Sequence, residues 1–374
     1  MAFAISGFKA VAQNFISRGI ASNYYQKLPF LTMLAALSIA RGNKTDPLEI
    51  GRPEGKIYAG RLLSEGDVQN LQNFNAYQPR IQQFETSNSK WMGKYDTTPL
   101  TASQQTNAHS QAGQATALFY RSRLKTPIWV WHTDKDRCLT RETKMGQGLA
   151  LSQCIDEATE VGFQDHVKAL NTGIWSGSPT DQTDDPWDAP LGIAEALDTT
   201  NTYGNVNRST TANAAWRAQK DTTWTSEDIY AILDNANITK GLRTYGQGVD
   251  VIVCDQTRYL KFKRQILAQS GNAACMKEGL PEFAKMGVKQ EVLQVDNAYV
   301  IYDPTCPTNT VLALSMGTWK MMIAPGKNLN VSKFTDLSDK TEGAKEADQA
   351  FVETEFIFSC DNPYLNVRYT AVGT

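Results

Sequence analysis

The sequence predicts an α+β protein, and three stretches carry that prediction. Residues 140–173 repeat apolar residues at helical spacing, over a length that indicates one long helix. Residues 117–131 are rich in aromatic and β-branched residues and partly alternate, which is typical of a strand. From Thr225 onward, helical stretches alternate with short apolar runs, and further strands follow to the end. We expect the other elements to be arranged around the long helix.

The stretch from Thr140 to Gly173 keeps one apolar stripe throughout, formed by Leu151, Ile155, Ala158, Gly162, Phe163, Val167 and Leu170. At roughly 1.5 Å per residue, this helix would span on the order of 50 Å, so other elements must lie along it. Thr140 is the expected N-cap, and Asn171 and Gly173 are the expected C-cap residues. Three glycines within the stretch are interpreted as bends or close contacts rather than breaks: Gly146, Gly148 and Gly162.

Composition describes a globular chain without a strong overall charge. The 374 residues are 41% hydrophobic, which is enough for a sizeable core and for two or three lobes. The 37 Lys and Arg residues nearly balance 39 Asp and Glu residues, so no global field draws the chain onto nucleic acid. Six scattered cysteines without a CxxC pair indicate reduced thiols rather than a zinc ribbon or a disulfide framework.

The most apolar run, Leu28 to Ala40, is too short to span a bilayer. The N-terminus also lacks a charged region followed by an apolar core and a cleavage site. We therefore expect neither a membrane anchor nor secretion.

The first 45 residues differ in charge from the rest of the chain, because they contain cations and no acidic residue: Lys9, Arg18, Lys27, Arg41 and Lys44. Five apolar residues in the same segment have helical spacing and would form a short amphipathic helix: Phe8, Val11, Ala12, Phe15 and Ile16. Two interpretations remain open with equal weight. The segment is either a solvated terminal arm, or an arm that packs on a partner or faces a polyanion.

Residues 42–114 are rich in Gly, Asn, Gln, Thr and Ser, with isolated aromatic residues such as Phe84 and Trp91. Such a stretch cannot build its own core, and long irregular segments in a globular chain are usually functional loops or disorder. Because this one returns through the strand at 117–131, we expect a projecting two-stranded loop. After the long helix, Asp181, Asp184, Asp185 and Asp188 lack EF-hand spacing, so a solvated loop is expected rather than a Ca²⁺ site.

The last third reads as alternating helices and strands. Thr225 with Asp228 resembles a capping box at a helix start, and Asp255 is the expected cap of a second helix after the strand Val249 to Cys254. Later strands are expected at Lys289 to Val295, Tyr299 to Tyr302, Thr310 to Leu314, Trp319 to Ala324, Phe351 to Ser359 and Val367 to Val372.

No constellation for catalysis is visible. Of the three histidines, His109, His132 and His166, none lies in an HExxH pattern, and His166 is interpreted as a surface or satisfied core residue. The sequence contains no nucleophile elbow, phosphate loop or dinucleotide fingerprint. We therefore expect no catalytic, cofactor-binding or metal-binding residue, and no enzyme.

Five segments stand in a specific order: KLPFLTML (27–34), LEIGRP (48–53), PLGIAEALDTTNTYGNVNRSTTANAAWRAQ (190–219), VDVIVCDQTRYLKFKRQIL (249–267) and YVIYDPTCP (299–307). In this order, with the basic arm, the polar loop and the long helix, they resemble the major capsid proteins of tailed bacteriophages, which have the Hong Kong 97-type fold. In the third segment, five residues occupy places that match the family: Gly204, Arg208, Ser209, Trp216 and Arg217. Two positions depart from the family, because Asn207 stands where an acidic residue is frequent and Tyr203 where a second glycine is common.

The resemblance implies five parts. They are an N-terminal arm (1–50), an extended loop with its return strand (51–135), a spine helix region of a peripheral domain (136–190), an axial domain with a long connection (191–300) and late strands that complete both domains (301–374). It also implies a subunit that self-assembles, through pentamers and hexamers, into the icosahedral shell around a double-stranded DNA genome. The shell would assemble in the bacterial cytoplasm and belong to the virion.

The partners implied are the chain itself, a scaffolding protein, a portal, a decoration protein in some members, and packaged DNA bound without sequence preference; no membrane is implied. Some members weld their shells by a bond between Lys and Asn, but Lys90, Lys94 and Asn88 match by residue type only, so no cross-link is expected. Two alternatives stay open. One is an encapsulin-like compartment that encloses protein cargo, and the other is a soluble α/β binding module or enzyme.

Overall fold

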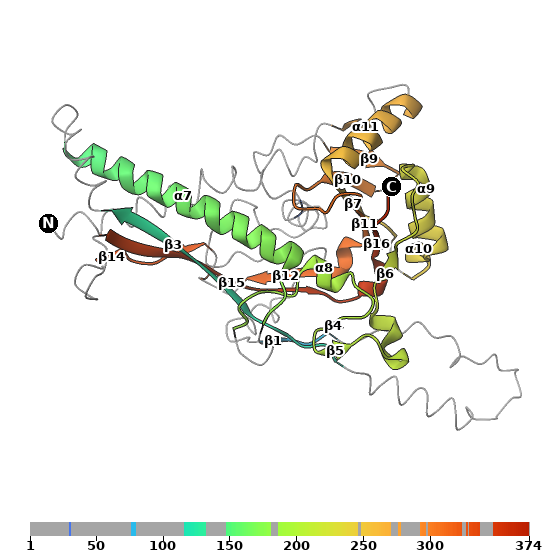
Figure 1. Cartoon of the computed structure of the whole chain (residues 1–374), viewed down its shortest axis with the longest axis horizontal. Helices are drawn as coiled ribbons and strands as arrows, with labels where there is room; N and C mark the ends of the chain where they lie inside the picture. Colours follow the sequence, from blue (N-terminus) through green and yellow to red (C-terminus); the bar gives the residue numbers. More distant parts are fainter. Residues whose placement is uncertain are drawn as a thin grey trace, which may run out of the picture.

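The structure is a computed structural model, and it describes residues 30, 76–79, 116–131, 147–180, 186–245, 248–270, 276–277, 292–296, 298–323, 327, 329–336 and 347–373. Helices and strands are both present, so the chain is a mixed α and β protein, as expected. Figure 1 shows an elongated part, in which one long helix crosses a narrow sheet, and a broader lobe that carries the C-terminus. None of the described helices is both long and apolar enough to cross a membrane.

The expected long helix is α7 (Gln147–Ser176), and its first residue lies seven positions after Thr140, which falls outside the described residues. Its end differs from the sequence prediction, because the helix continues past Asn171 and Gly173 to Ser176. The reason is tertiary packing, since Ile174 and Trp175 are both buried in the core and hold the last turn in place.

The residue that follows α7 is Gly177, whose N–H donates to the Gly173 carbonyl at 2.8 Å. A Cβ at this position would lie only 2.5 Å from the Pro190 carbonyl oxygen. A residue with a side chain would therefore force the returning chain away from the end of α7.

Beneath α7 lies an antiparallel sheet built on β15 (Ala347–Cys360), the longest strand among the described residues. On one edge, β15 pairs with β3 (Ser122–Trp131) along ten residue pairs. Along the other edge it pairs with β12 (Trp319–Ile323), β13 (Asn330–Val331) and β14 (Thr335–Asp336).

Of the three glycines expected in the long helix, Gly162 is at a close contact, because a Cβ there would lie 2.6 Å from Ile128 Cγ1 on β3. Gly148 lies in the first turn of α7, and Gly146 lies outside the described residues.

The strand expected at 117–131 is confirmed, although it is divided at Arg121 into β2 (Phe119–Tyr120) and β3. β2 pairs antiparallel with β1 (Ala76–Tyr77), so the chain leaves through β1 and returns through β2. The base of the expected two-stranded loop is thus present, while residues 80–115 lie outside the described residues.

The lobe contains a seven-stranded sheet of order β6-β16-β11-β7-β10-β9-β8. Its strands are β6 (Gln219–Asp221), β7 (Val251–Cys254), β8 (Met276–Lys277), β9 (Val292–Val295), β10 (Ala298–Tyr302), β11 (Val311–Leu314) and β16 (Val367–Tyr369). β7 and β10 pair in parallel, as do β6 and β16, and the other neighbours are antiparallel. The late strands expected from the sequence are therefore confirmed within a few residues at their ends.

Helices cover the outer face of this sheet. They are α9 (Ile229–Asp234), continued by a π-helical segment at Asn235–Thr239, α10 (Leu242–Tyr245) and α11 (Gln256–Ser270). Asp255 caps α11 as expected, because its Oδ1 accepts from the Arg258 N–H at 3.0 Å. The start of α9 corrects the sequence prediction. Asp228 alone is the N-cap, while the Thr225 carbonyl accepts the Gly373 N–H at 2.9 Å instead.

The connection between α7 and the lobe carries short elements: α8 (Ile193–Ala196), β4 (Thr202–Tyr203), β5 (Val206–Asn207) and a 3-10 helix at Thr211–Trp216. Two further 3-10 turns, at Met316–Thr318 and Pro363–Leu365, adjoin β12 and β16.

Candidate functional site at the junction of the two parts

The elongated part and the lobe meet at a buried aromatic cluster that holds the one described residue of the first 45. Phe30 is fully buried, and its ring lies edge-on to Trp175 at the end of α7 and to Trp319 on β12, with centroids 6.1 Å apart in both pairs. Phe30 is therefore held between the end of α7 and the long sheet.

Asp303, in the turn after β10, lies at the same junction and is fully buried. Burial raises the pKa of its carboxyl, while hydrogen bonds from the backbone N–H groups of Thr305 and Phe30 partly oppose this shift. The bond from Thr305 measures 2.9 Å, and the Thr305 hydroxyl in turn accepts from Asn171 Nδ2 on α7 at 2.6 Å. The turn after β10 thus connects Phe30 to α7.

The strand β1, at the base of the expected loop, is held by a second set of polar groups, of which Lys320 is buried. The Tyr77 hydroxyl on β1 donates to Asp361 Oδ2 at 3.2 Å. Lys320 on β12 is buried, contacts both the Tyr77 hydroxyl and the Asp361 carboxylate, and lies 4.8 Å from the Tyr77 ring centroid. A buried ammonium is stable only when paired, so Lys320 binds the loop base firmly to the sheet.

Where the loop returns, its backbone is joined to the connection that follows α8. The Ala117 N–H donates to the Pro79 carbonyl at 3.0 Å, and the Leu118 N–H donates to the Gly204 carbonyl at 2.9 Å. Gly204 has a φ of +59°, and a Cβ there would lie 2.9 Å from the Phe119 ring. Only glycine tolerates both this conformation and this close approach without strain.

Within residues 190–219, the structure brings together several of the residues on which the sequence resemblance rests. Arg208 is fully buried and donates from Nε to the Asn201 carbonyl and from Nη1 to the Ala196 carbonyl, both at 2.8 Å. Its guanidinium lies 5.2 Å from the Tyr203 ring centroid, and burial lowers its pKa. Trp216 Nε1 donates to the Tyr203 carbonyl at 3.0 Å, which closes the turn. These contacts order the whole connection.

On the face of the long sheet away from α7, Glu355 is buried among cations. Its carboxylate lies 2.6 Å from Arg123 Nη2, 3.1 Å from Arg121 Nη1 and 3.7 Å from Lys327 Nζ. The hydrogen bond from Arg123 and the charge of Arg121 lower the pKa of Glu355 against the opposing effect of burial, so it stays ionised at neutral pH.

The structure confirms the interpretation of His166, on α7, as a core residue with satisfied hydrogen bonds. Its ring is fully buried, with Nδ1 2.9 Å from the Thr126 hydroxyl and Nε2 2.8 Å from the Thr354 hydroxyl. Burial lowers the pKa of His166 to about 4, so the ring is neutral under ordinary conditions. It joins α7 to β3 and β15, whereas His109 and His132 lie outside the described residues.

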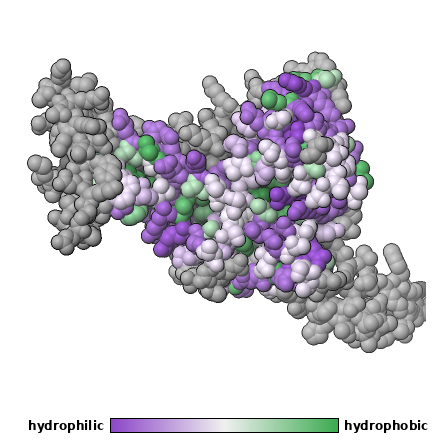
Figure 2. All heavy atoms as spheres, viewed as in Figure 1, coloured by the Kyte–Doolittle hydropathy of each residue, from purple (hydrophilic) through white to green (hydrophobic). Residues whose placement is uncertain are grey.

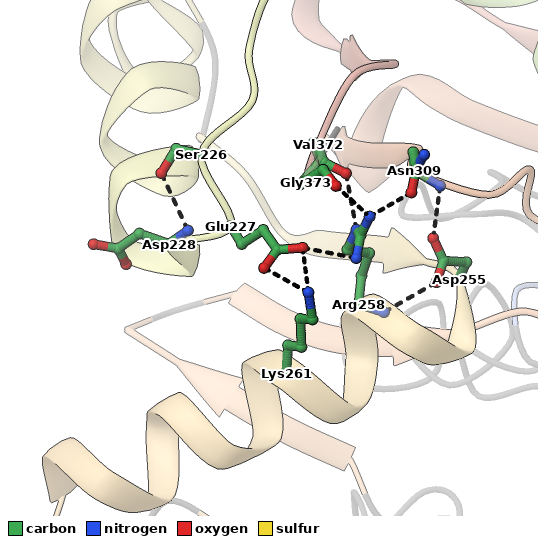
Figure 3. Close-up of polar contacts among 9 residues, drawn as sticks. All are labelled: Ser226, Glu227, Asp228, Asp255, Arg258, Lys261, Asn309, Val372 and Gly373. Carbon is green, nitrogen blue, oxygen red and sulfur yellow. Dashed lines mark hydrogen bonds and ion pairs between the residues drawn. The ribbon is translucent and has the colours of Figure 1, made fainter.

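The last residues of the chain are held in the lobe by a cluster shown in Figure 3. Arg258 on α11 is buried and donates from Nε to the Val372 carbonyl at 2.9 Å. Its Nη1 lies 2.7 Å from Glu227 Oε1, and the same carboxylate lies 2.6 Å from Lys261 Nζ. This cluster binds the C-terminal segment to α11 and to Glu227, which lies just before the N-cap of α9.

Within the described residues, no three His, Cys, Asp or Glu side chains lie close enough to hold a metal ion. Cys254, Cys306 and Cys360 are buried thiols whose pKa values are raised by burial, that of Cys360 to about 12. Asp188 accepts from the Thr180 backbone at 3.2 Å, and its three neighbouring aspartates in the sequence lie outside the described residues.

No family model and no curated protein matches the chain. Among solved structures, a capsid asymmetric unit of cyanophage A-1(L) is 13% identical and covers 84% of this chain and 95% of that chain, with a TM-score of 0.47. The capsid of an empty GTA particle is 11% identical over 84% and 92%, with a TM-score of 0.44. An encapsulin complex from Synechococcus elongatus PCC 7942 is 8% identical over 84% and 90%, with a TM-score of 0.41. The chain is similar to these structures at low identity.

Proposed function

We propose that the chain is the major capsid subunit of a tailed bacteriophage, and that it self-assembles through pentamers and hexamers into the icosahedral shell around a double-stranded DNA genome. The observation that carries this proposal is the junction. There, buried Phe30 lies within the basic N-terminal stretch, and partly buried Tyr77 lies within the polar stretch 42–114, whose composition cannot build its own core. Segments of this kind are completed by neighbouring copies in an assembly.

The described architecture fits the parts of such a subunit. α7 with the sheet of β15 would serve as the spine and the peripheral domain, and the seven-stranded lobe as the axial domain. In residue numbers we propose an arm at 1–50, an extended loop at 51–135, the spine region at 136–190, the axial domain at 191–300 and completing strands at 301–374.

A structural role also agrees with how the buried polar groups are used. Arg208 binds backbone carbonyls, His166 binds two threonine hydroxyls, and Lys320 binds a tyrosine and an aspartate. Each joins one element to another instead of converging on a shared pocket, so we propose no enzymatic activity.

For partners, we propose that the basic N-terminal segment lines the interior, first against a scaffolding protein and later near DNA, whose phosphates attract cations regardless of sequence. A portal would occupy one vertex, and a decoration protein is compatible with the fold. The protein would assemble in the host cytoplasm and end in the virion.

The decisive experiment is electron microscopy, with sedimentation, of the protein expressed alone and with its neighbouring phage genes. We expect closed shells, and in native particles an absorbance ratio that indicates nucleic acid. Shells filled with protein and devoid of DNA would instead support the encapsulin-like alternative. A monodisperse small oligomer under all conditions would exclude a shell and leave a soluble module or enzyme.

The same particles allow a test for covalent cross-links between subunits. Lys90, Lys94 and Asn88 lie outside the described residues, and their spacing gives no signal for a cross-link. We expect boiled shells to run as single subunits on a denaturing gel, and a ladder of multimers would contradict this.

A further inference from the structure

The outward side of α11 carries two exposed leucines with a cation between them. Leu260, Arg264 and Leu267 follow one another at steps of four and three, which places them on one side of the helix. Leu260 and Leu267 keep 47% and 37% of their surface exposed, although large aliphatic side chains are usually buried. The other side of the helix is fixed, because Phe262 and Ile266 are buried in the core of the lobe. We call the three outward residues the α11 patch.

The cation of this patch differs from the other cations of α11. Figure 3 shows that Arg258 and Lys261 both bind Glu227. Lys263 also interacts within the chain. Arg264 is exposed, and it forms no ion pair or side-chain hydrogen bond with any residue that the structure describes. The α11 patch therefore suits a partner surface that presents a carboxylate beside an apolar side chain.

A surface of that kind lies where α9 continues as a π-helical segment. Ile238 keeps 69% of its surface exposed, the largest value for a large hydrophobic side chain among the described residues. Asp234 precedes it by about one helical turn, so both lie on the same side. The Asp234 carboxylate is exposed and forms no ion pair or hydrogen bond within the described part of the chain. We call these two residues the α9 patch.

The π-helical turn holds Ile238 in its outward position. The Lys240 N–H donates to the Asn235 carbonyl at 2.8 Å, which is the hydrogen-bond spacing of a π-helix. On the inner side, Asn237 is buried, and its Oδ1 accepts from the Val249 N–H at 2.9 Å. Because the backbone on both sides of Ile238 is bonded, little conformational entropy is lost when a partner covers this side chain.

Within one copy, the two patches lie apart on the lobe. Figure 1 shows α11 at the top of the lobe and α9 along its right-hand side, with α10 below. The Ile229 N–H at the start of α9 donates to Gln265 of α11 at 3.1 Å, and Ile238 lies roughly 12 Å further along the helix. Figure 2, in the same view, shows a largely hydrophilic lobe broken by small hydrophobic patches. The α11 patch can therefore meet an α9 patch only on another molecule.

We propose that the α11 patch of one copy docks on the α9 patch of the next copy in a ring of subunits. Arg264 pairs with Asp234 across the contact, and the two leucines cover Ile238. Because two different patches meet, the contact is heterologous, and its repetition closes a ring when the rotation between copies allows it. The charge pair fixes the orientation of the neighbours, and the aliphatic side chains exclude water. This inference rests on the proposed self-assembly and names one contact within the pentamers and hexamers.

Charge reversal on each patch, followed by recombination, tests the pairing. The first variant carries Arg264→Glu and the second carries Asp234→Arg. A third chain carries both changes, which restores opposite charges across the contact. The matched control carries Lys333→Glu, which makes the same change in net charge as the first variant at an exposed cation beside β13.

For each single reversal, we expect the subunit concentration needed for half-maximal assembly to rise roughly ten-fold, because an exposed ion pair is replaced by repulsion. The chain with both changes should return to within about three-fold of the wild type, and the control should match the wild type. At about 1 M salt, where charges act only within roughly 3 Å, the single reversals should approach the wild type. Leu260→Gln with Leu267→Gln should instead assemble poorly at both salt concentrations, because apolar burial does not depend on charge.

A cross-link tests the heterologous geometry directly. One chain carries Leu260→Cys, another carries Ile238→Cys, and the unaltered chain gives the background from its own six cysteines. After treatment with a short bismaleimide, an assembled mixture of the two chains should give a covalent dimer that neither chain gives alone. A chain with both changes should give a ladder of multimers on a denaturing gel, since each copy is then joined to the next.

Assembly of the first variant at the wild-type concentration would overturn the pairing, and so would an equal loss in the control or a double reversal no better than its parents. Circular dichroism verifies that each subunit is folded. If a reversal variant does not fold, the cross-link decides, because its chains keep both charges. Shells that form without this cross-link would refute the pairing alone, whereas a wild-type chain that forms no assembly would refute the proposed function itself.

Discussion

The lobe and the elongated part bury their sheets in different ways. In the lobe, adjacent residues of β7 such as Ile252 and Val253 point to opposite faces, and both are fully buried. In the elongated part, Ile128 is buried beneath α7, but Trp129 beside it keeps 40% of its surface exposed, and Phe351 on the paired strand keeps 36%. The lobe sheet is covered on both faces, whereas the part of the long sheet around Trp129 and Phe351 leaves one face partly exposed.

The difference explains how polar groups are used. Lobe strands such as VIVC and VLAL are continuous apolar runs, which is typical of a sheet covered on both sides. Around Trp129 and Phe351 the long sheet has apolar packing beneath α7 only, whereas Phe356 to Phe358 are buried on both faces. This sheet also has buried polar contacts through His166, Glu355 and Lys320. This region is thus more sensitive to charge, to pH and to its neighbours than the lobe is.

The largest effect is expected from removing the projecting loop. Deletion of Gln83 to Thr106 should leave a folded subunit, because β1 and β2 remain paired at the loop base. Closed shells should be lost, since the loop is proposed to reach a neighbouring copy. Electron microscopy and circular dichroism of the same sample check both halves. Shells of normal size and stability would show that the loop makes no essential contact.

Acid should weaken the elongated part before the lobe, through His166. Its pKa is about 4 when folded and near 6.5 when unfolded, so between these values the unfolded state binds a proton that the folded state does not. Stability should therefore fall as the pH drops from about 6.5 to 4, by about 3 kcal/mol in all. Hydrogen exchange at residues 160–170 should accelerate before that at 251–266.

The matched variant is His166→Gln, which keeps hydrogen-bonding groups near Thr126 and Thr354 but does not titrate. It should lose this part of the pH dependence. A variant with the same pH profile as the wild type would assign the acid sensitivity to another group.

A smaller effect is expected from Gly162→Ala. The added Cβ would lie 2.6 Å from Ile128 Cγ1, so α7 must move away from β3 at a cost of about 2 kcal/mol. Gly173→Ala is the control, because its Cβ would meet only the Pro190 ring at 3.5 Å and helix propensity should make it neutral or stabilising. Urea unfolding measures both, and equal stabilities would mean that helix and sheet are not in tight contact at Gly162.

The smallest effect, and the most dependent on salt, is expected at the N-terminal segment. Changing Lys9, Arg18 and Lys27 to Glu should leave the subunit folded, because these residues precede the buried Phe30. Assembly or genome retention should fall several-fold, more at low salt, where charges act over roughly 30 Å. Normal packaging by the triple variant, or ready proteolysis of this segment on intact shells, would place it outside or leave it without a role.

Local patterns predicted most elements but not what connects them. The alternation in residues 117–131 and the periodicity of α7 are set by nearest neighbours in the sequence, and both strand and helix were found. The predicted end of α7 was wrong. Burial of Ile174 and Trp175 stabilises the last helical turn by more free energy than the stop signals at Asn171 and Gly173 cost.

The junction could not be predicted in the same way. The pairing of Tyr77 with Lys320 joins residues 243 positions apart, and neither side chain carries a local signal for the other. Phe30 lies in an apolar run that a sequence pattern alone does not place. Arg208 was singled out from the sequence by the family resemblance. Its hydrogen bonds to backbone carbonyls could be identified only from the structure.

The length of α7 has a mechanical consequence. A helix of 30 residues extends about 45 Å from the junction, and β15 with its 14 residues runs beneath it as a second stiff member. A tilt of about 5° at the junction would displace the far end by roughly 4 Å, about the diameter of a methyl group. Phe30 packs against Trp175 and Trp319 at the junction end of α7. A sub-ångström adjustment of this packing would therefore change the direction of the whole elongated part.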